Sequence, residues 1–119
     1  MSLRVLIIED HSDTLLVLKS LLCRWGYEVS AAESLESGLA HIRAKEFDII
    51  LSDIGLPDGT GYALVAEAKR KQKKLKAIAL TGYNSAADVE IGRMSGFDSY
   101  LTKPCDTRLL RKVLPPSSA

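Results

Sequence analysis

The sequence predicts an α/β fold in which a parallel sheet is covered by helices on both faces. Short apolar runs alternate with helical segments five times along 119 residues. Several of these runs are continuous, as in strands that are buried on both faces. Such an alternation is typical of parallel strands joined by right-handed crossovers. The length suits one domain with a single core.

The first strand and the first helix occupy residues 3–25. Residues 3–8 form a buried strand that ends in Glu9 and Asp10. A helix is expected over residues 11–25, because its apolar side chains recur at three- and four-residue spacing and share one stripe: Leu15, Leu18, Leu22 and Trp25. Gly26 suits the C-terminal end of this helix.

A short second strand at residues 27–31 leads to a second helix. Ser34 is the expected N-cap of that helix, which continues to about residue 45 and buries Leu35, Leu39 and Ile42. The third strand follows, and its apolar run leads directly to Asp53. Asp53 therefore lies at the carboxyl end of a buried strand, where open α/β sheets place their active sites.

The second half of the chain repeats this alternation. A turn is expected over residues 58–61, and further strands at residues 75–80 and 97–101. Helices are expected at residues 62–71, 85–94 and 107–114. Ser85 and Asp106 are the expected N-caps of the last two helices, and Gly96 ends the earlier one. Residues 115–119 are expected to form a linker or an added tail, so the domain covers residues 3–114.

The composition limits the class of partner. The net charge is +1, which argues against direct binding of nucleic acid or of a membrane through overall charge. The basic run from Lys69 to Lys76 is expected to be a solvated helix end. No signal peptide or membrane span is recognisable, and neither Cys23 nor Cys105 has a metal ligand at the usual spacing. A cytoplasmic location is therefore expected.

Charged and hydroxyl side chains end four of the five predicted strands. Glu9 and Asp10 follow the first strand and Asp53 the third, while Thr81 and Lys103 follow the fourth and fifth. Carboxylates gathered at one sheet edge repel one another unless a cation lies among them, and such oxygen ligands suit Mg²⁺. Together with a lysine and a hydroxyl, they predict a phosphoryl-transfer site with Asp53 as the nucleophile.

Each of these residues also has an ordinary structural explanation. Glu9 and Asp10 can favour the positive end of the helix that follows them. Thr81 can be a turn hydroxyl, and Lys103 can be a solvated lysine. Chance placement of such residues at the ends of four separate strands is far less probable than any single coincidence.

At these positions the sequence resembles the receiver domain of two-component response regulators. The resemblance covers essentially residues 3–114, and its motifs are Glu9-Asp10, Asp53 with Leu56-Pro57-Asp58-Gly59, Leu80-Thr81-Gly82 and Lys103-Pro104. It implies a flavodoxin-like (βα)5 three-layer sandwich with five parallel strands in the order 2-1-3-4-5. It also implies a phosphorylation-dependent signalling switch that catalyses only its own phosphoryl transfer and autodephosphorylation.

The resemblance assigns metal ligands and a phosphoacceptor. Asp53 is the expected phosphoacceptor. Asp10 and Asp53 are the expected direct Mg²⁺ ligands, Glu9 acts through water, and Gly55 contributes its backbone carbonyl. Because any residue could supply a backbone carbonyl, the identity of Gly55 adds nothing to this assignment.

The resemblance also implies a switch and its partners. Lys103 is expected to pair with one phosphoryl oxygen and Thr81 to hydrogen-bond another, while Tyr100 is the switch aromatic that turns inward. The expected donor is a phosphohistidine on a sensor histidine kinase or a histidine phosphotransfer protein. The expected output face comprises residues 85–94, the fifth strand and the last helix. It controls a partner protein or an attached domain, and a phosphorylation-linked homodimer is a further option.

Two alternatives come from other functional classes. One is a receiver-fold interaction module that is not phosphorylated. The other is an aspartate-nucleophile phosphatase of the haloacid dehalogenase kind, which would place a second aspartate where this chain has Gly55. The segments Leu80-Thr81-Gly82-Tyr83 and Gly96-Phe97-Asp98 favour the receiver of a hybrid sensor histidine kinase as the parent, with a free single-domain regulator as the alternative.

Overall fold

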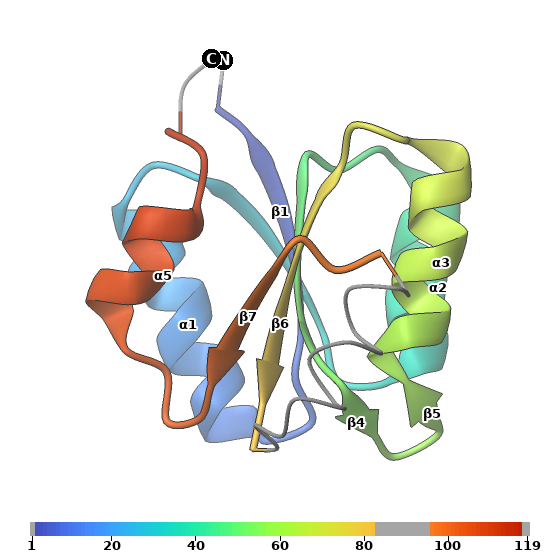
Figure 1. The fold of residues 1–119 in the computed structure, drawn as a ribbon, viewed down its shortest axis with the longest axis horizontal. Helices are drawn as coiled ribbons and strands as arrows, with labels where there is room; N and C mark the ends of the chain where they lie inside the picture. Colours follow the sequence, from blue (N-terminus) through green and yellow to red (C-terminus); the bar gives the residue numbers. More distant parts are fainter. Residues whose placement is uncertain (1, 83–95, 118–119) are drawn as a thin grey trace.

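The computed structural model describes residues 2–82 and 96–117 and contains a central five-stranded parallel sheet (Figure 1). Its strands lie in the order β2-β1-β3-β6-β7. Counting these five strands alone gives the order 2-1-3-4-5, so the predicted fold class is confirmed. The strand bounds are β1 Arg4–Ile8, β2 Glu28–Ala32, β3 Ile49–Asp53, β6 Lys76–Thr81 and β7 Ser99–Thr102.

Helices cover both faces of this sheet (Figure 1). α1 (Ser12–Arg24) and α5 (Thr107–Val113) lie on one face, whereas α2 (Leu35–Ala44) and α3 (Gly61–Lys71) lie on the other. The helix expected at residues 85–94 falls outside the described residues. None of the described helices is long and apolar enough to cross a membrane.

The continuous apolar runs of the sequence form the middle of the molecule. β1, β3 and β6 each have a neighbouring strand on both sides, and their apolar residues are buried. Successive side chains of a strand point to opposite faces, so each strand contributes to two cores. Ile50 packs in the core with residues of α2 and α3, and Leu51 packs in the core with residues of α1 and α5. The runs are uninterrupted because neither face of these strands meets water.

Polar residues and glycine mark the helix ends where the sequence predicts them. Ser34 Oγ accepts a hydrogen bond from Ser37 N at 3.1 Å, and Asp106 Oδ1 accepts one from Arg108 N at 2.9 Å. Gly26 follows α1 with a φ of 97°, a conformation that favours glycine. The observed bounds differ from the predicted ones by one or two residues.

The structure differs from the sequence prediction at two places. The predicted turn at residues 58–61 is part of a two-stranded antiparallel hairpin, β4 (Gly55–Leu56) and β5 (Gly59–Thr60). On α2, Gly38 is buried, whereas the predicted core residues Leu35 and Leu39 are only half-buried. A Cβ on Gly38 would lie 2.4 Å from Leu64 Cδ1, so the missing side chain allows α2 to approach α3 closely.

The C-terminal residues pack against the start of the chain. Leu3 N donates a hydrogen bond to Ser117 O at 2.7 Å, and the Tyr27 hydroxyl donates one to the Pro115 carbonyl. Leu3 directly precedes β1, so these contacts lie at the amino ends of the strands, away from the carboxyl edge. Residues 115–117 of the expected linker or tail are therefore fixed on the domain.

Candidate functional site

The carboxyl edge of the sheet gathers the residues that the sequence singled out. Glu9 and Asp10 directly follow β1, Asp53 ends β3, Thr81 ends β6, and Lys103 directly follows β7. The parallel pairing of these four strands is what brings residues distant in sequence to one edge.

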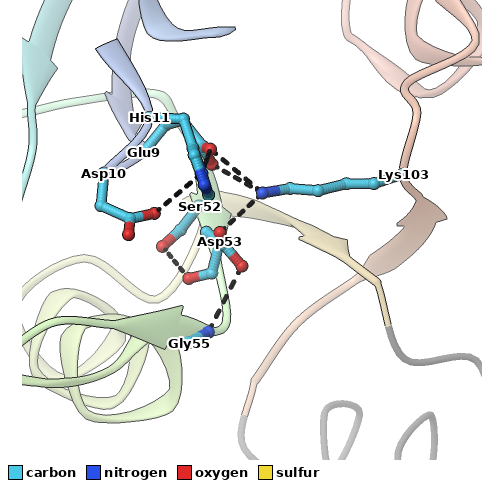
Figure 2. A network of polar contacts seen from close by, with 7 residues as sticks. All are labelled: Glu9, Asp10, His11, Ser52, Asp53, Gly55 and Lys103. Carbon is cyan, nitrogen blue, oxygen red and sulfur yellow. Dashed lines mark hydrogen bonds and ion pairs between the residues drawn. The ribbon is translucent and has the colours of Figure 1, made fainter.

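Lys103 joins carboxylates from two different strands (Figure 2). Its Nζ lies 2.7 Å from Asp53 Oδ2, and 3.1 and 3.0 Å from Oε1 and Oε2 of Glu9. The side chain of Glu9 is fully buried, and that of Asp53 is 12% exposed. Buried carboxylates are costly unless a cation is paired with them, so the Lys103 ammonium is what makes their burial tolerable.

The pKa of Lys103 reflects a balance between burial and its partners. Burial by itself lowers the pKa of Lys103, because it disfavours the charged form. The hydrogen bonds and charges of Asp53 and Glu9 outweigh burial and raise the pKa above its ordinary value of 10.5. Lys103 therefore stays charged throughout the physiological range and holds a permanent positive charge against Asp53.

The backbone around Asp53 is held in place from two sides. Gly55 N donates to Asp53 Oδ1 at 3.3 Å, and Ser52 Oγ donates to the Asp53 carbonyl at 2.8 Å. The first residue of α3, Gly61, approaches this carbonyl so closely that a Cβ there would lie 2.5 Å from the oxygen. Gly61 N also donates to the Ile54 carbonyl at 2.9 Å. A side chain at position 61 would push α3 away from the loop that carries Asp53.

His11 lies beside the acidic residues that follow β1 (Figure 2). Its Nδ1 is 3.0 Å from Glu9 Oε1 and 3.4 Å from Asp10 Oδ1. His11 occupies the N-cap position of α1, yet its side chain makes no capping hydrogen bond. The ring is thus committed to the carboxylates rather than to the helix end.

Thr81 and Tyr100 connect the edge of the sheet to an aromatic cluster. Thr81 is buried, and its carbonyl accepts a hydrogen bond from Lys103 N at 2.8 Å. The hydroxyl of Tyr100 lies 3.2 Å from that of Tyr62 on α3. Both rings meet Phe97 edge-on, with centroids 6.0 Å away for Tyr62 and 6.3 Å away for Tyr100. Tyr100 is therefore packed toward α3 in this conformation.

A divalent cation fits the chemistry of these donors. Glu9, Asp10 and His11 each offer one ligand atom, and the three atoms lie within 4.8 Å of one another. Asp53 and Glu9 share a single ammonium, so the carboxylates keep an excess of negative charge. Mg²⁺ prefers a few carboxylates completed by water, so these donors suit it, and the assignment of Asp10 and Asp53 as its direct ligands stays a prediction. The contact of Gly55 with Asp53 uses its amide, and the predicted use of its carbonyl stays a prediction.

Comparison with known proteins decides the family. A family model for the response regulator receiver domain matches residues 5–115. The chain belongs to this family. It is therefore a receiver domain of two-component signalling, as its sequence motifs predicted.

Curated relatives carry this receiver as one part of a longer protein. It is 30% identical over 115 residues to the transcriptional regulatory protein ZraR of Salmonella typhimurium, covering 97% of this chain and 26% of ZraR. It is 34% identical over 116 residues to the sensor protein GacS of Pseudomonas syringae, covering 93% of this chain and 13% of GacS. The receiver thus spans about a quarter or less of the length of these relatives.

Solved receivers share the same backbone arrangement. A CheY-like receiver domain protein from Methanospirillum hungatei is 36% identical with a TM-score of 0.88, covering 95% of this chain and 91% of that one. A response regulator from Burkholderia pseudomallei, solved with a phosphorylated aspartic acid, a calcium ion and citrate, is 29% identical with a TM-score of 0.87. That match covers 94% of this chain and 66% of the other.

Three contacts at the receiver site were not predicted from the sequence. His11 directly follows Asp10 in the sequence, but no local pattern assigns it a role. Gly61 falls in the predicted turn at residues 58–61, and a turn glycine does not by itself reveal a close approach to the Asp53 carbonyl. Tyr62 was only the expected start of a helix. Its spacing from Tyr100 carries no local pattern, because the two tyrosines meet through the tertiary fold.

Proposed function

We propose that this receiver is a phosphorylation-dependent switch in which Asp53 accepts a phosphoryl group from a phosphohistidine in the presence of Mg²⁺. The observation that carries the proposal is the position of Lys103 Nζ, 2.7 Å from Asp53 Oδ2 at the carboxyl edge of the sheet. An ammonium at this distance can pair with the Asp53 carboxylate and, after transfer, with an oxygen of the phosphoryl group attached to it. The phosphorylated aspartic acid of the Burkholderia relative supports the same chemistry.

The site residues have separate tasks in this transfer. The N–P bond of the phosphohistidine breaks, and a new O–P bond forms to a carboxylate oxygen of Asp53. Lys103 pairs with one phosphoryl oxygen, and the hydroxyl of Thr81 hydrogen-bonds another. A Mg²⁺ ion on the neighbouring carboxylates would supply further positive charge to the phosphoryl oxygens.

The switch itself is a shift between two conformations of similar energy. The phosphoryl group favours the one in which Thr81 contacts it, and Tyr100 then changes its position. We propose a sensor histidine kinase or a histidine phosphotransfer protein as the donor, and a partner protein or an attached domain as the output. The domain turns over no separate substrate.

Intact mass spectrometry after incubation with acetyl phosphate and Mg²⁺ tests the proposal. Wild type is expected to gain one labile phosphoryl group, and Asp53→Asn is expected to gain none. Asp48→Asn is the matched control, because Asp48 directly precedes the same strand at its amino end and its Oδ2 accepts a hydrogen bond from Arg4 N. This control is expected to be phosphorylated like wild type.

Three results would redirect the proposal. No adduct on wild type under any condition would favour the interaction module that is not phosphorylated. An adduct that persists on Asp53→Asn would place the phosphoacceptor elsewhere. Steady hydrolysis of a generic phosphomonoester would favour the phosphatase alternative.

The phosphorylated form is expected to be short-lived. Gly55 and Gly82 flank the site, and a Cβ added at either position would meet no atom of the described residues within 4 Å. The phosphoryl group on Asp53 would therefore be open to attacking water. A half-life of many hours at neutral pH with Mg²⁺ would contradict this expectation.

A further inference from the structure

The strongest feature that the proposed function leaves unused is the ring of His11. We propose that His11 is a nitrogen ligand of the cation site, so that this receiver prefers transition-metal ions to Mg²⁺ more strongly than its carboxylates alone would. The proposal rests on the proposed function only in that a divalent cation binds among the acidic residues after β1. It concerns which ion these residues select.

The position of His11 carries the argument. Its Nδ1 lies 3.0 Å from Glu9 Oε1 and 3.4 Å from Asp10 Oδ1, and one ligand atom from each of these three residues lies within 4.8 Å of the other two (Figure 2). A cation bound to Asp10 would therefore lie within reach of an imidazole nitrogen. In binding it, Nδ1 would exchange its contact with Glu9 for the cation.

The helix end does not compete for the His11 ring. An N-cap residue normally uses its side chain to accept a hydrogen bond from the first turn, and Ser, Thr, Asp and Asn are preferred there. Ser34 and Asp106 do this on α2 and α5, but His11 at the same position of α1 makes no such bond. The ring is 71% exposed, so it can rotate toward an incoming ion at little cost.

The donor set predicts the selectivity. Oxygen ligands suit Mg²⁺, which gains little from an imidazole, whereas Co²⁺, Ni²⁺ and Zn²⁺ bind imidazole well. Two carboxylates and one imidazole thus form a mixed site that strengthens transition-metal binding selectively. Removing the imidazole should lower the affinity for these ions and leave the Mg²⁺ affinity unchanged or slightly higher.

Calorimetric titration of the metal-free receiver with Mg²⁺ and with Co²⁺ tests this selectivity. For His11→Ala we expect the Co²⁺ affinity to fall roughly tenfold or more, as is typical when a metal site loses one of its supporting groups. The Mg²⁺ affinity should stay within about twofold of wild type or rise. His41→Ala is the matched control, because His41 lies on α2 against Phe47, and it should change neither affinity.

Two results would overturn the inference. If His11→Ala binds Co²⁺ as tightly as wild type does, the ring is no ligand. If the affinities for Co²⁺ and Mg²⁺ fall by the same factor, His11 only positions the carboxylates. Asp10→Asn should weaken both ions, which places the Co²⁺ at this site. Failure of wild type to bind Mg²⁺ would contradict the proposed function, while the effect of His11→Ala on Co²⁺ still decides the role of His11.

Discussion

Replacing Lys103 with methionine is the sharpest test of the electrostatics of the site. Methionine keeps much of the aliphatic length and removes the charge, so Glu9 and Asp53 lose their shared cation. Lys69→Met is the matched control, because Lys69 Nζ lies 2.8 Å from Asp98 Oδ2. The difference between the two ion pairs is burial, since the Asp98 side chain is 42% exposed and that of Glu9 is fully buried.

The size of the effect follows from that burial. Breaking a buried ion pair by removing one partner costs about 3–5 kcal/mol, whereas an exposed pair contributes about 1 kcal/mol or less. Because Lys103 is itself 26% exposed, we expect Lys103→Met to lose about 2–3 kcal/mol of unfolding free energy at pH 7. That is a fall in Tm of about 8–12 °C for a domain of this size. Lys69→Met should lose less than about 1 kcal/mol.

The pH and metal dependence make this prediction specific. A buried carboxylate that has lost its cation can become neutral by taking up a proton. For a glutamate, protonation costs about 3.7 kcal/mol at pH 7 but only about 1 kcal/mol at pH 5. The deficit of Lys103→Met should therefore shrink as the pH is lowered. Adding Mg²⁺ should stabilise Lys103→Met more than wild type and so reduce the deficit, because the ion binds the folded state and supplies positive charge that only the variant has lost.

Urea unfolding in a chelator at pH 5 and pH 7, and then with Mg²⁺, measures all of these effects. In wild type the raised pKa of Lys103 means that its contribution is fully present below pH 10.5 and is lost only as the pH rises through the folded value. The reasoning is refuted if Lys103→Met loses no more stability than Lys69→Met, or if its deficit at pH 5 equals that at pH 7.

Two further changes test the loops around the site. Gly61→Ala should cost about 1–3 kcal/mol, because its Cβ would lie 2.5 Å from the Asp53 carbonyl oxygen. Gly82→Ala should be nearly neutral in the same urea titration, because its Cβ would meet no atom within 4 Å among the residues that the structure describes. Backbone hydrogen bonds at the start of α2, with that of Glu36 the largest cause, hold the pKa of Asp58 below its usual 3.8. The stability from this contact is therefore present above pH 3.8 and is lost as the pH falls through the folded pKa, so Asp58→Ala should differ from wild type at pH 7 and converge with it in acid.

The fold could be predicted because its central strands have a recognisable hydropathy pattern in the sequence. β1, β3 and β6 are covered on both faces, so each is a continuous apolar run, and the alternation with helices then requires parallel pairing. The β4–β5 hairpin has no such pattern, since strands of two residues are too short to show a hydrophobic periodicity. The burial of Gly38 escaped prediction for a related reason. A position without a side chain has no hydropathy to detect, although it decides how closely two helices pack.

The candidate site could be predicted as a set of residues but not as a set of contacts. Parallel topology alone places Glu9, Asp53 and Lys103 at one edge. It does not say which carboxylates Lys103 meets. In the structure Lys103 pairs with Glu9 and Asp53, whereas Asp10 lies near His11 with its side chain 35% exposed. Glu9 is fully buried and Asp10 is partly exposed although they are adjacent, and the position of a strand's end in the sequence does not predict this division.

The same charged residues also determine the net charge around a phosphoryl group on Asp53. The carboxylates of Glu9, Asp10 and Asp53 outnumber the Lys103 ammonium by two, so this edge of the sheet is strongly negative before a phosphoryl group is attached. A phosphoryl group on Asp53 would add further negative charge while competing with Glu9 for the same ammonium. A divalent cation among these residues brings the balance close to neutral, which is why phosphoryl transfer at this edge should depend on one.

We expect Lys103 to link this charge to the aromatic residues Tyr62, Phe97 and Tyr100. Its backbone amide donates a hydrogen bond to the Thr81 carbonyl, and Tyr100 lies three residues earlier, on β7, in contact with Tyr62 and Phe97. We expect a lysine side chain that turns from Glu9 toward a phosphoryl group to move the end of β7, and β7 carries Tyr100. The expected route from Asp53 to the tyrosine pair therefore passes through one short strand and reaches the part of the core that contains Phe97 and packs against α3.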